Sequence, residues 1–109
     1  MNKAKHKRLE AKGWRIGTAS AFLGLSPEEA ALVEMRVNLG QALRARRVAR
    51  GLSQLALAKR LRSSQSRIAK MEAADQSVSL DLLVRGLVTL GARPRDIAKA
   101  LGRAPRAAA

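Results

Sequence analysis

Residues 52–74, LSQLALAKRLRSSQSRIAKMEAA, contain two short helical patterns with only three or four residues between them. Ser53 is a suitable N-cap for the first helix, and Ser63 or Ser64 can cap the second, over about 65–73, because serine hydroxyls accept hydrogen bonds from free backbone N–H groups. The residues expected to face the interior are Leu57, Ala58, Leu61, Ile68 and Met71. The pattern therefore predicts two short helices connected by a tight turn.

Such a pair favours a helix-turn-helix, in which the first helix needs a small residue where the second crosses it. Ala58 is placed for that role. The second helix would bury one face and leave the other free for DNA. The side chains predicted to read bases on that free face are Gln65, Ser66, Arg67 and Lys70. Glutamine pairs well with adenine, arginine or lysine with guanine, and serine with either.

A second set of polar residues is predicted to contact DNA phosphates. Hydroxyls, amides, basic side chains and the N–H groups at a helix start are the usual ligands of the DNA backbone. The predicted residues are Gln54, Ser64, Arg47, Arg50, Lys59 and Arg62. The alternative is that the polar face of the second helix is simply solvated, and that the arginines before Gly51 only complement a helix end.

The charge of the whole chain supports a polyanionic partner. Among 109 residues, 22 are Lys or Arg and 8 are Asp or Glu, which gives a formal net charge of +14. Such an excess produces a positive potential that attracts nucleic acid. RNA is a weaker candidate than double-stranded DNA, because RNA readers usually expose aromatic side chains, and Trp14 and Phe22 are the only aromatic residues.

The segments on either side of this pair, between about residues 26 and 101, also have helical patterns, so the predicted fold class is all-α. Ser26-Pro27-Glu28-Glu29 is a strong helix start with a capping box, and the helix can extend to about Arg50, with Gly40 as a possible bend. Its expected apolar stripe is Leu32, Met35, Leu39, Ala42 and Leu43. Further helices are expected from Ser79 to Gly91 and from Pro94 to Leu101. The predicted domains are a basic arm and extension (1–25), a DNA-binding domain (26–101) and a disordered tail (102–109).

The residues of the central stretch resemble a known family. Ser53-Gln54, Leu57-Ala58, Ser64-Gln65, Ile68 and Met71-Glu72 match the phage-repressor/Cro (Xre) helix-turn-helix pattern without gaps. The resemblance covers about residues 40–101 and implies a lambda-repressor-like domain of five helices. It also implies that Gln54 contacts a phosphate, that Gln65, Ser66 and Lys70 contact bases, that Arg67 contacts a base or the backbone, and that Glu72 is structural.

Two positions depart from the family pattern. Arg62 stands where the turn often has glycine, and Ala74 stands where a glycine commonly ends the second helix. A left-handed backbone costs a non-glycine residue roughly 1 kcal/mol or more. Either turn, and with it the angle of the reading helix, is therefore expected to differ in detail from the family.

The stretch KGWRIGTASAFLGLSPEEA before the domain is similar to HigA-type antitoxins and related regulators encoded beside RelE-like toxins. That resemblance implies a dimeric repressor of its own operon, and a RelE-like toxin as a second partner. The candidate partner-binding residues are Trp14, Ile16, Phe22 and Leu23, which DNA binding explains least. The alternative is a stand-alone phage-repressor-like regulator without a toxin. The apolar residues of the last two helices offer a candidate dimer surface.

Other function classes are disfavoured by what the sequence lacks. There is no cysteine and a single histidine, His6, so no metal site and no cofactor are expected. No paired carboxylates, phosphate loop or nucleophile–base set indicates an enzyme. No apolar stretch is long enough to span a membrane and no secretion signal is visible, so a cytoplasmic protein is expected.

Overall fold

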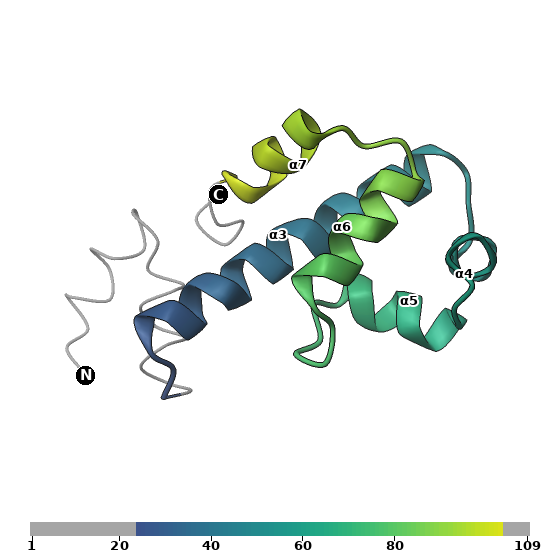
Figure 1. Cartoon of the computed structure of the whole chain (residues 1–109). Helices are drawn as coiled ribbons and strands as arrows, with labels where there is room; N and C mark the ends of the chain where they lie inside the picture. Colours follow the sequence, from purple (N-terminus) through teal and green to yellow (C-terminus); the bar gives the residue numbers. More distant parts are fainter. Residues whose placement is uncertain (1–23, 104–109) are drawn as a thin grey trace. The chain divides into compact units, whose positions relative to one another are not determined.

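The computed structural model describes residues 24–103, which form five helices and contain no strand. The helices are α3 (Pro27–Ala49), α4 (Gln54–Leu61), α5 (Gln65–Glu72), α6 (Leu80–Thr89) and α7 (Pro94–Leu101) (Figure 1). The described part confirms the predicted all-α class, and each of these helices begins within a residue or two of its predicted start.

Local hydrogen bonds explain where the helices start. Ser26 Oγ accepts from the Glu29 N–H at 3.1 Å, and Glu29 Oε1 accepts from the Ser26 N–H at 2.7 Å, which is the predicted capping box. Ser53, Ser64 and Ser79 each accept a hydrogen bond from the backbone N–H three residues later. The sequence left Ser63 and Ser64 as alternative caps, and the structure shows that Ser64 is the cap.

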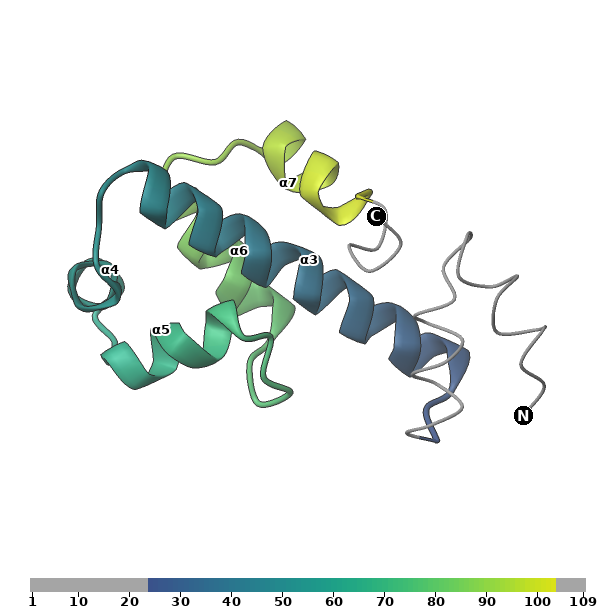
Figure 2. The ribbon, with the colours of Figure 1, turned by 180° about the vertical axis from the view of Figure 1, so that it is seen from behind.

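Residues 35–102 form one compact unit around a core of aliphatic side chains. The fully buried large residues are Leu39, Leu43, Leu57, Ile68, Met71, Leu83 and Leu90, together with Asn38. The C-terminal part of α3 and α6 lie between α7 on one side and α5 on the other, in both views of the ribbon (Figures 1 and 2). Asn38 Nδ2 donates to the Leu101 carbonyl at 3.4 Å and so ties the end of α7 to α3.

Gly40 marks a close approach of two helices, and α3 continues through it without a break. A Cβ at this position would lie 2.7 Å from the Met71 carbonyl oxygen and 3.2 Å from that of Glu72. These carbonyls belong to the last turn of α5, so the missing side chain allows the backbone of α5 to rest on α3. The helix is not interrupted at Gly40, and the glycine is explained by this packing, whereas a bend at Gly40 stays a prediction.

One expectation about buried apolar residues is wrong, and the packing leaves less apolar surface than another expectation assumed. Leu32 and Met35, placed in the buried stripe, are 43 % and 37 % exposed, whereas Leu39 and Leu43 are buried as predicted. The apolar residues of α6 and α7 were expected to offer a dimer surface, but most of them pack into the core of the domain itself. Of the large apolar residues on these two helices, those classed as exposed are Val88 and Leu101.

Candidate nucleic-acid interface

Helices α4 and α5 form a helix-turn-helix. α4 is seen end-on in Figures 1 and 2 while α5 lies across the view, so the two helices cross steeply. Ala58, predicted as the small residue at the crossing, is 1 % exposed. Its carbonyl accepts a hydrogen bond from the Ser63 N–H at 2.8 Å, which closes the turn onto α4.

The turn before α5 and the turn after it both use left-handed backbone. Arg62 has φ 54° and Ala74 has φ 59°, and these are the non-glycine residues with positive φ in the described chain. They are also the two positions where the family pattern commonly has glycine. Both residues therefore adopt the left-handed conformation that favours glycine, despite its cost of roughly 1 kcal/mol or more. A difference in detail between these turns and those of the family stays a prediction.

The inner and outer sides of α5 have different chemistry. Ile68 and Met71 on the inner side have no exposed surface. The four residues predicted to read bases, Gln65, Ser66, Arg67 and Lys70, are all exposed. α5 therefore presents an amide, a hydroxyl, a guanidinium and an ammonium group on one solvent-facing surface.

A shallow hollow of about 280 Å³ lies along this outer side. It is lined by Ser64, Ser66, Arg67, Lys70, Ser77 and Val78. Ser77 and Val78 come from the loop between α5 and α6, and the sequence did not point to them because no helical period or motif covers this loop. The same loop is ordered by Asp75, whose carboxylate accepts hydrogen bonds from both the N–H and the Oγ–H of Ser77. The Ser77 hydrogen bonds lower the pKa of Asp75, the side-chain one most, so the carboxylate stays ionised.

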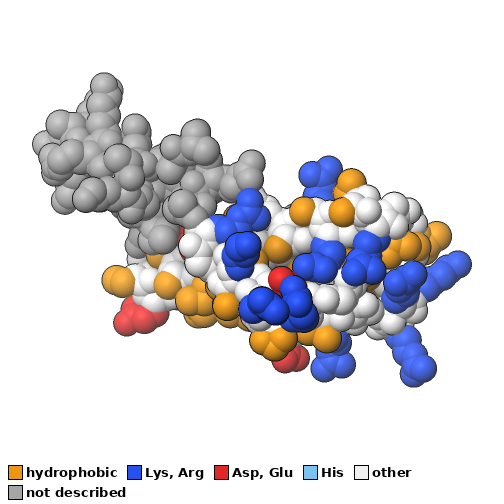
Figure 3. Space-filling model, turned by 90° about the horizontal axis from the view of Figure 1, so that it is seen from above, with side chains coloured by type: hydrophobic (Ala, Val, Ile, Leu, Met, Phe, Trp, Pro, Cys, Tyr) orange, Lys and Arg blue, Asp and Glu red, His pale blue; other side chains and the backbone are white. Residues whose placement is uncertain are grey.

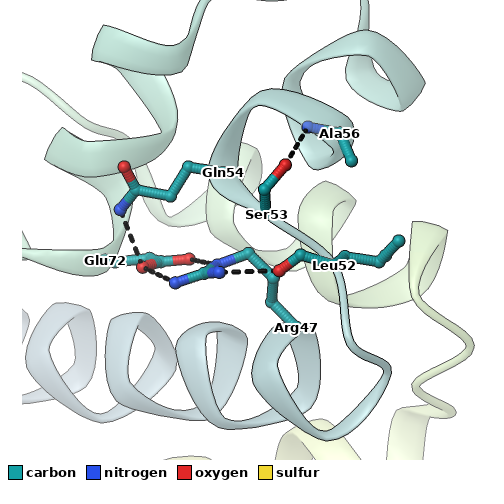
Figure 4. A network of polar contacts seen from close by, with 6 residues as sticks. All are labelled: Arg47, Leu52, Ser53, Gln54, Ala56 and Glu72. Atoms are coloured by element: carbon teal, nitrogen blue, oxygen red, sulfur yellow. Dashed lines mark hydrogen bonds and ion pairs between the residues drawn. The ribbon is translucent and has the colours of Figure 1, made fainter.

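A polar network fixes α5 from the inside (Figure 4). Arg47 Nε lies 2.5 Å from Glu72 Oε2, and Arg47 Nη2 lies 3.0 Å from Glu72 Oε1. Arg47 Nη1 also donates to the Leu52 carbonyl at 2.7 Å, and Gln54 Nε2 donates to Glu72 Oε1 at 3.1 Å. The network connects the ends of α3 and α5 with the start of α4. The side-chain hydrogen bond to Glu72 raises the pKa of Arg47, so its guanidinium stays charged at any physiological pH.

This network changes the roles expected for two predicted phosphate contacts. The Arg47 side chain is only 12 % exposed and points toward Glu72, so its predicted role as a phosphate contact is replaced by a structural one. Gln54 keeps its carbonyl oxygen and one N–H beyond its bond to Glu72, at the start of α4. Glu72, with a side chain 5 % exposed, occupies the structural position that the resemblance implied.

The remaining predicted phosphate contacts are all exposed: Ser64, Arg50, Lys59 and Arg62. They do not form one surface. Ser64 starts α5, and Lys59 and Arg62 lie at the end of α4 and in the turn. Arg50 instead lies against the turn between α6 and α7, since a Cβ at Gly91 would lie 2.8 Å from Arg50 Nη2.

The predicted partner-binding residues, Trp14, Ile16, Phe22 and Leu23, lie outside the described residues, as does His6. Between residues 24 and 103, no group of three or more His, Asp or Glu side chains is arranged to hold a metal ion. None of the helices in that part of the chain combines the length and apolar character needed to cross a membrane.

Comparison with known proteins gives one match. A family model described as a helix-turn-helix domain matches residues 38–101, which include the C-terminal part of α3 and all of α4 to α7. No curated protein and no solved structure matches the chain. The matched residues contain the outer side of α5, the polar network and both left-handed turns.

Proposed function

The chain belongs to the helix-turn-helix domain family, and from that premise we propose that it is a transcriptional repressor that places α5 in the major groove of double-stranded DNA. The observation that carries the proposal is the outer side of α5. Gln65, Ser66, Arg67 and Lys70 are exposed on a helix whose inner side chains, Ile68 and Met71, are completely buried. These are the side-chain types that discriminate bases in the major groove.

The contacts divide into two kinds with different consequences. Gln65, Ser66, Arg67 and Lys70 read base edges, whereas Ser64, Lys59 and Arg62 hold the backbone on either side of the turn. Gln54 adds a contact at the start of α4. Base contacts confer discrimination between sequences, while phosphate contacts confer affinity for any sequence and make binding salt-dependent.

The proposed repressor acts as a homodimer. One α5 offers four base-reading side chains, and two copies on half-sites one helical turn apart would double that number. Because α6 and α7 use most of their apolar residues in the core, exposed residues of α3 such as Leu32 and Met35 are better candidates for the contact between copies.

Selection of bound duplexes from a random pool at physiological salt tests the proposal. A two-fold symmetric consensus is the expected result, whereas no enrichment would contradict sequence-specific recognition.

Lys70→Ala and Gln65→Ala should then each reduce discrimination between the consensus and random DNA by about 1–3 kcal/mol. Equal loss on both DNAs would contradict the base-reading assignment. Arg62→Ala is the matched variant, expected to weaken binding to both DNAs and to lower the salt slope by about 1.

A second, compatible function is that of an antitoxin in a type II toxin–antitoxin operon. It rests on the similarity of KGWRIGTASAFLGLSPEEA to HigA-type regulators, and Trp14, Ile16, Phe22 and Leu23 are its candidate contacts. Co-expression of the chain with the product of a neighbouring short reading frame tests it. Co-purification that is lost in Trp14→Ala/Phe22→Ala supports a toxin partner, and a chain that stays uncomplexed with full repressor activity supports the stand-alone regulator.

A further inference from the structure

The side of the domain opposite α5 carries a second cluster of cations. Figure 3 looks down on the α7 side and shows Lys and Arg side chains gathered there with few acidic ones between them. We name this the α7 cluster, and its members are Arg46, Arg50, Arg93, Arg95 and Lys99. None of these side chains belongs to α4, to α5 or to the polar network around Glu72.

Asp96 is the one acidic residue that forms ion pairs within the cluster, as far as the chain is described. Asp96 Oδ2 lies 3.3 Å from Arg93 Nε and 3.8 Å from Arg46 Nη2, and it also accepts from the Arg93 N–H at 2.8 Å. Arg50 lies against the adjoining turn at Gly91. Arg95 and Lys99, which are i and i+4 on α7, are exposed and have no ion-pair partner in the described chain. The cluster therefore has five cations for one carboxylate.

The position of this cluster separates it from the reading face. α7 and α5 lie on opposite sides of α3 and α6 (Figures 1 and 2). A straight duplex that receives α5 in its major groove cannot also contact α7 of the same domain. The charge on this side consequently adds nothing to the contacts of the first duplex.

The chemistry of the cluster indicates its partner. Four of its five members are arginines, whose planar guanidinium groups pair with phosphate oxygens in a bidentate manner. A protein interface would need an apolar centre, and the exposed large apolar residue on α7 is Leu101, at the end of the helix away from Arg93. A second copy of the chain is disfavoured, because two such clusters facing each other would repel.

We propose that the α7 cluster binds the phosphate backbone of a second DNA duplex, so that the protein bridges two DNA segments. The proposal rests on the proposed function, since the first segment is the one held by α5. The second contact is independent of sequence and depends strongly on salt, because it consists of phosphate contacts alone.

A bridging assay tests this with the full chain. One duplex is fixed to beads, the protein is bound to it, and capture of a second, fluorescent duplex is measured. Arg95→Gln/Lys99→Gln should lower the affinity for the second duplex about tenfold or more and lower its salt slope by about 2. Arg44→Gln/Arg85→Gln removes the same charge outside the cluster and should leave capture within twofold of the unmodified chain.

Binding of the first duplex is measured separately by fluorescence anisotropy at low protein concentration. It should be unchanged in Arg95→Gln/Lys99→Gln and weakened in Lys70→Ala. If the first duplex binds but no second duplex is captured, bridging is wrong and the proposed function stands. If neither binds, the proposed function itself fails. Capture that is lost in the Lys70 variant but not in the α7 variant would mean that a dimer bridges through two copies of α5. Saturation of the cluster by polyglutamate but not by DNA would also overturn the proposal.

Discussion

The two sides of α5 show how one eight-residue helix is both fixed and left free. Its inner side is held by Ile68 and Met71 in the core, by backbone contact with Gly40, and by the ion pair of Glu72 with Arg47. Its outer side carries exposed polar groups that make no ion pair in the described chain. The inner residues thus fix the position of α5, and the outer residues supply its exposed polar groups. Substitutions on the inner side should mainly lower stability, and substitutions on the outer side should mainly change DNA binding.

The largest effect is expected from breaking the ion pair. Glu72→Ala leaves the Arg47 guanidinium largely buried without its carboxylate and removes the partner of Gln54. Removing one member of such a pair should lower the free energy of unfolding by about 3 kcal/mol, measured by urea denaturation. That is a large share of the stability of a small domain.

The control for this prediction replaces both partners. Arg47→Met/Glu72→Met fills the same space without charge and should recover most of the lost stability, because no unpaired charge remains buried. If the losses measured for Arg47→Met and for Glu72→Met alone simply add in the double variant, Arg47 and Glu72 are not coupled and the inner side is held by packing alone.

A smaller effect is expected from closing the gap between α3 and α5. Gly40→Ala places a Cβ 2.7 Å from the Met71 carbonyl oxygen, so the backbone of α5 must move away. The overpacking should cost about 2 kcal/mol in unfolding free energy, partly offset by better helix propensity. Because α5 itself shifts, DNA discrimination should fall as well.

Gly86→Ala is the matched substitution for Gly40→Ala. There the new Cβ would meet side-chain carbons, Met71 Cε at 3.1 Å and Leu43 Cδ1 at 3.2 Å, and methionine adapts easily. Its unfolding free energy should change by less than about 1 kcal/mol. Equal losses in the two variants would show that backbone contact at Gly40 has no special role.

Substitutions in the two left-handed turns can distinguish an effect on stability from an effect on DNA binding. Arg62→Gly and Ala74→Gly each relieve a strained φ, and each should stabilise the fold by about 0.5–1 kcal/mol in thermal or urea unfolding. Arg62→Gly should also weaken DNA binding severalfold because it removes the proposed phosphate contact, whereas Ala74→Gly should leave binding unchanged. Unaltered affinity in both variants would remove Arg62 from the interface.

The sequence predicted most of the fold because the local signals are strong. Serine caps, glycines after helix ends and helical spacing of leucines predicted the five helices of the described chain correctly. The residue types at successive positions of 53–72 identified the helix-turn-helix. Contacts between distant residues could not be predicted in the same way. Arg47 and Glu72 are 25 residues apart, so an arginine near a helix end was interpreted as a phosphate contact.

The roles of Gly40 and of the apolar residues of α3 could not be predicted either, because they too depend on contacts between segments that are distant in the sequence. Gly40 was interpreted from helix propensity, which says nothing about the carbonyls of α5 that pack on it. Leu32 and Met35 continue the helical stripe of Leu39, but the stripe extends beyond the residues that cover it. The hollow lined by Ser77 depends on how a loop folds beside α5, which has no periodic pattern in the sequence.

The smallest expected effect concerns Asp75, in the loop that follows α5. Hydrogen bonds from Ser77 lower its pKa below the ordinary value of 3.8, so the carboxylate stabilises the folded state above that pH. This contribution should disappear as the pH falls below 3.8 and through the lowered pKa. Asp75→Asn should therefore show a weaker loss of stability between neutral and acid pH than the unmodified chain.

Ser77→Ala removes the strongest of the hydrogen bonds and should raise the pKa of Asp75, measured by carbon NMR of its carboxyl group. An unshifted titration in Ser77→Ala would show that the loop beside the reading face is not ordered by this carboxylate.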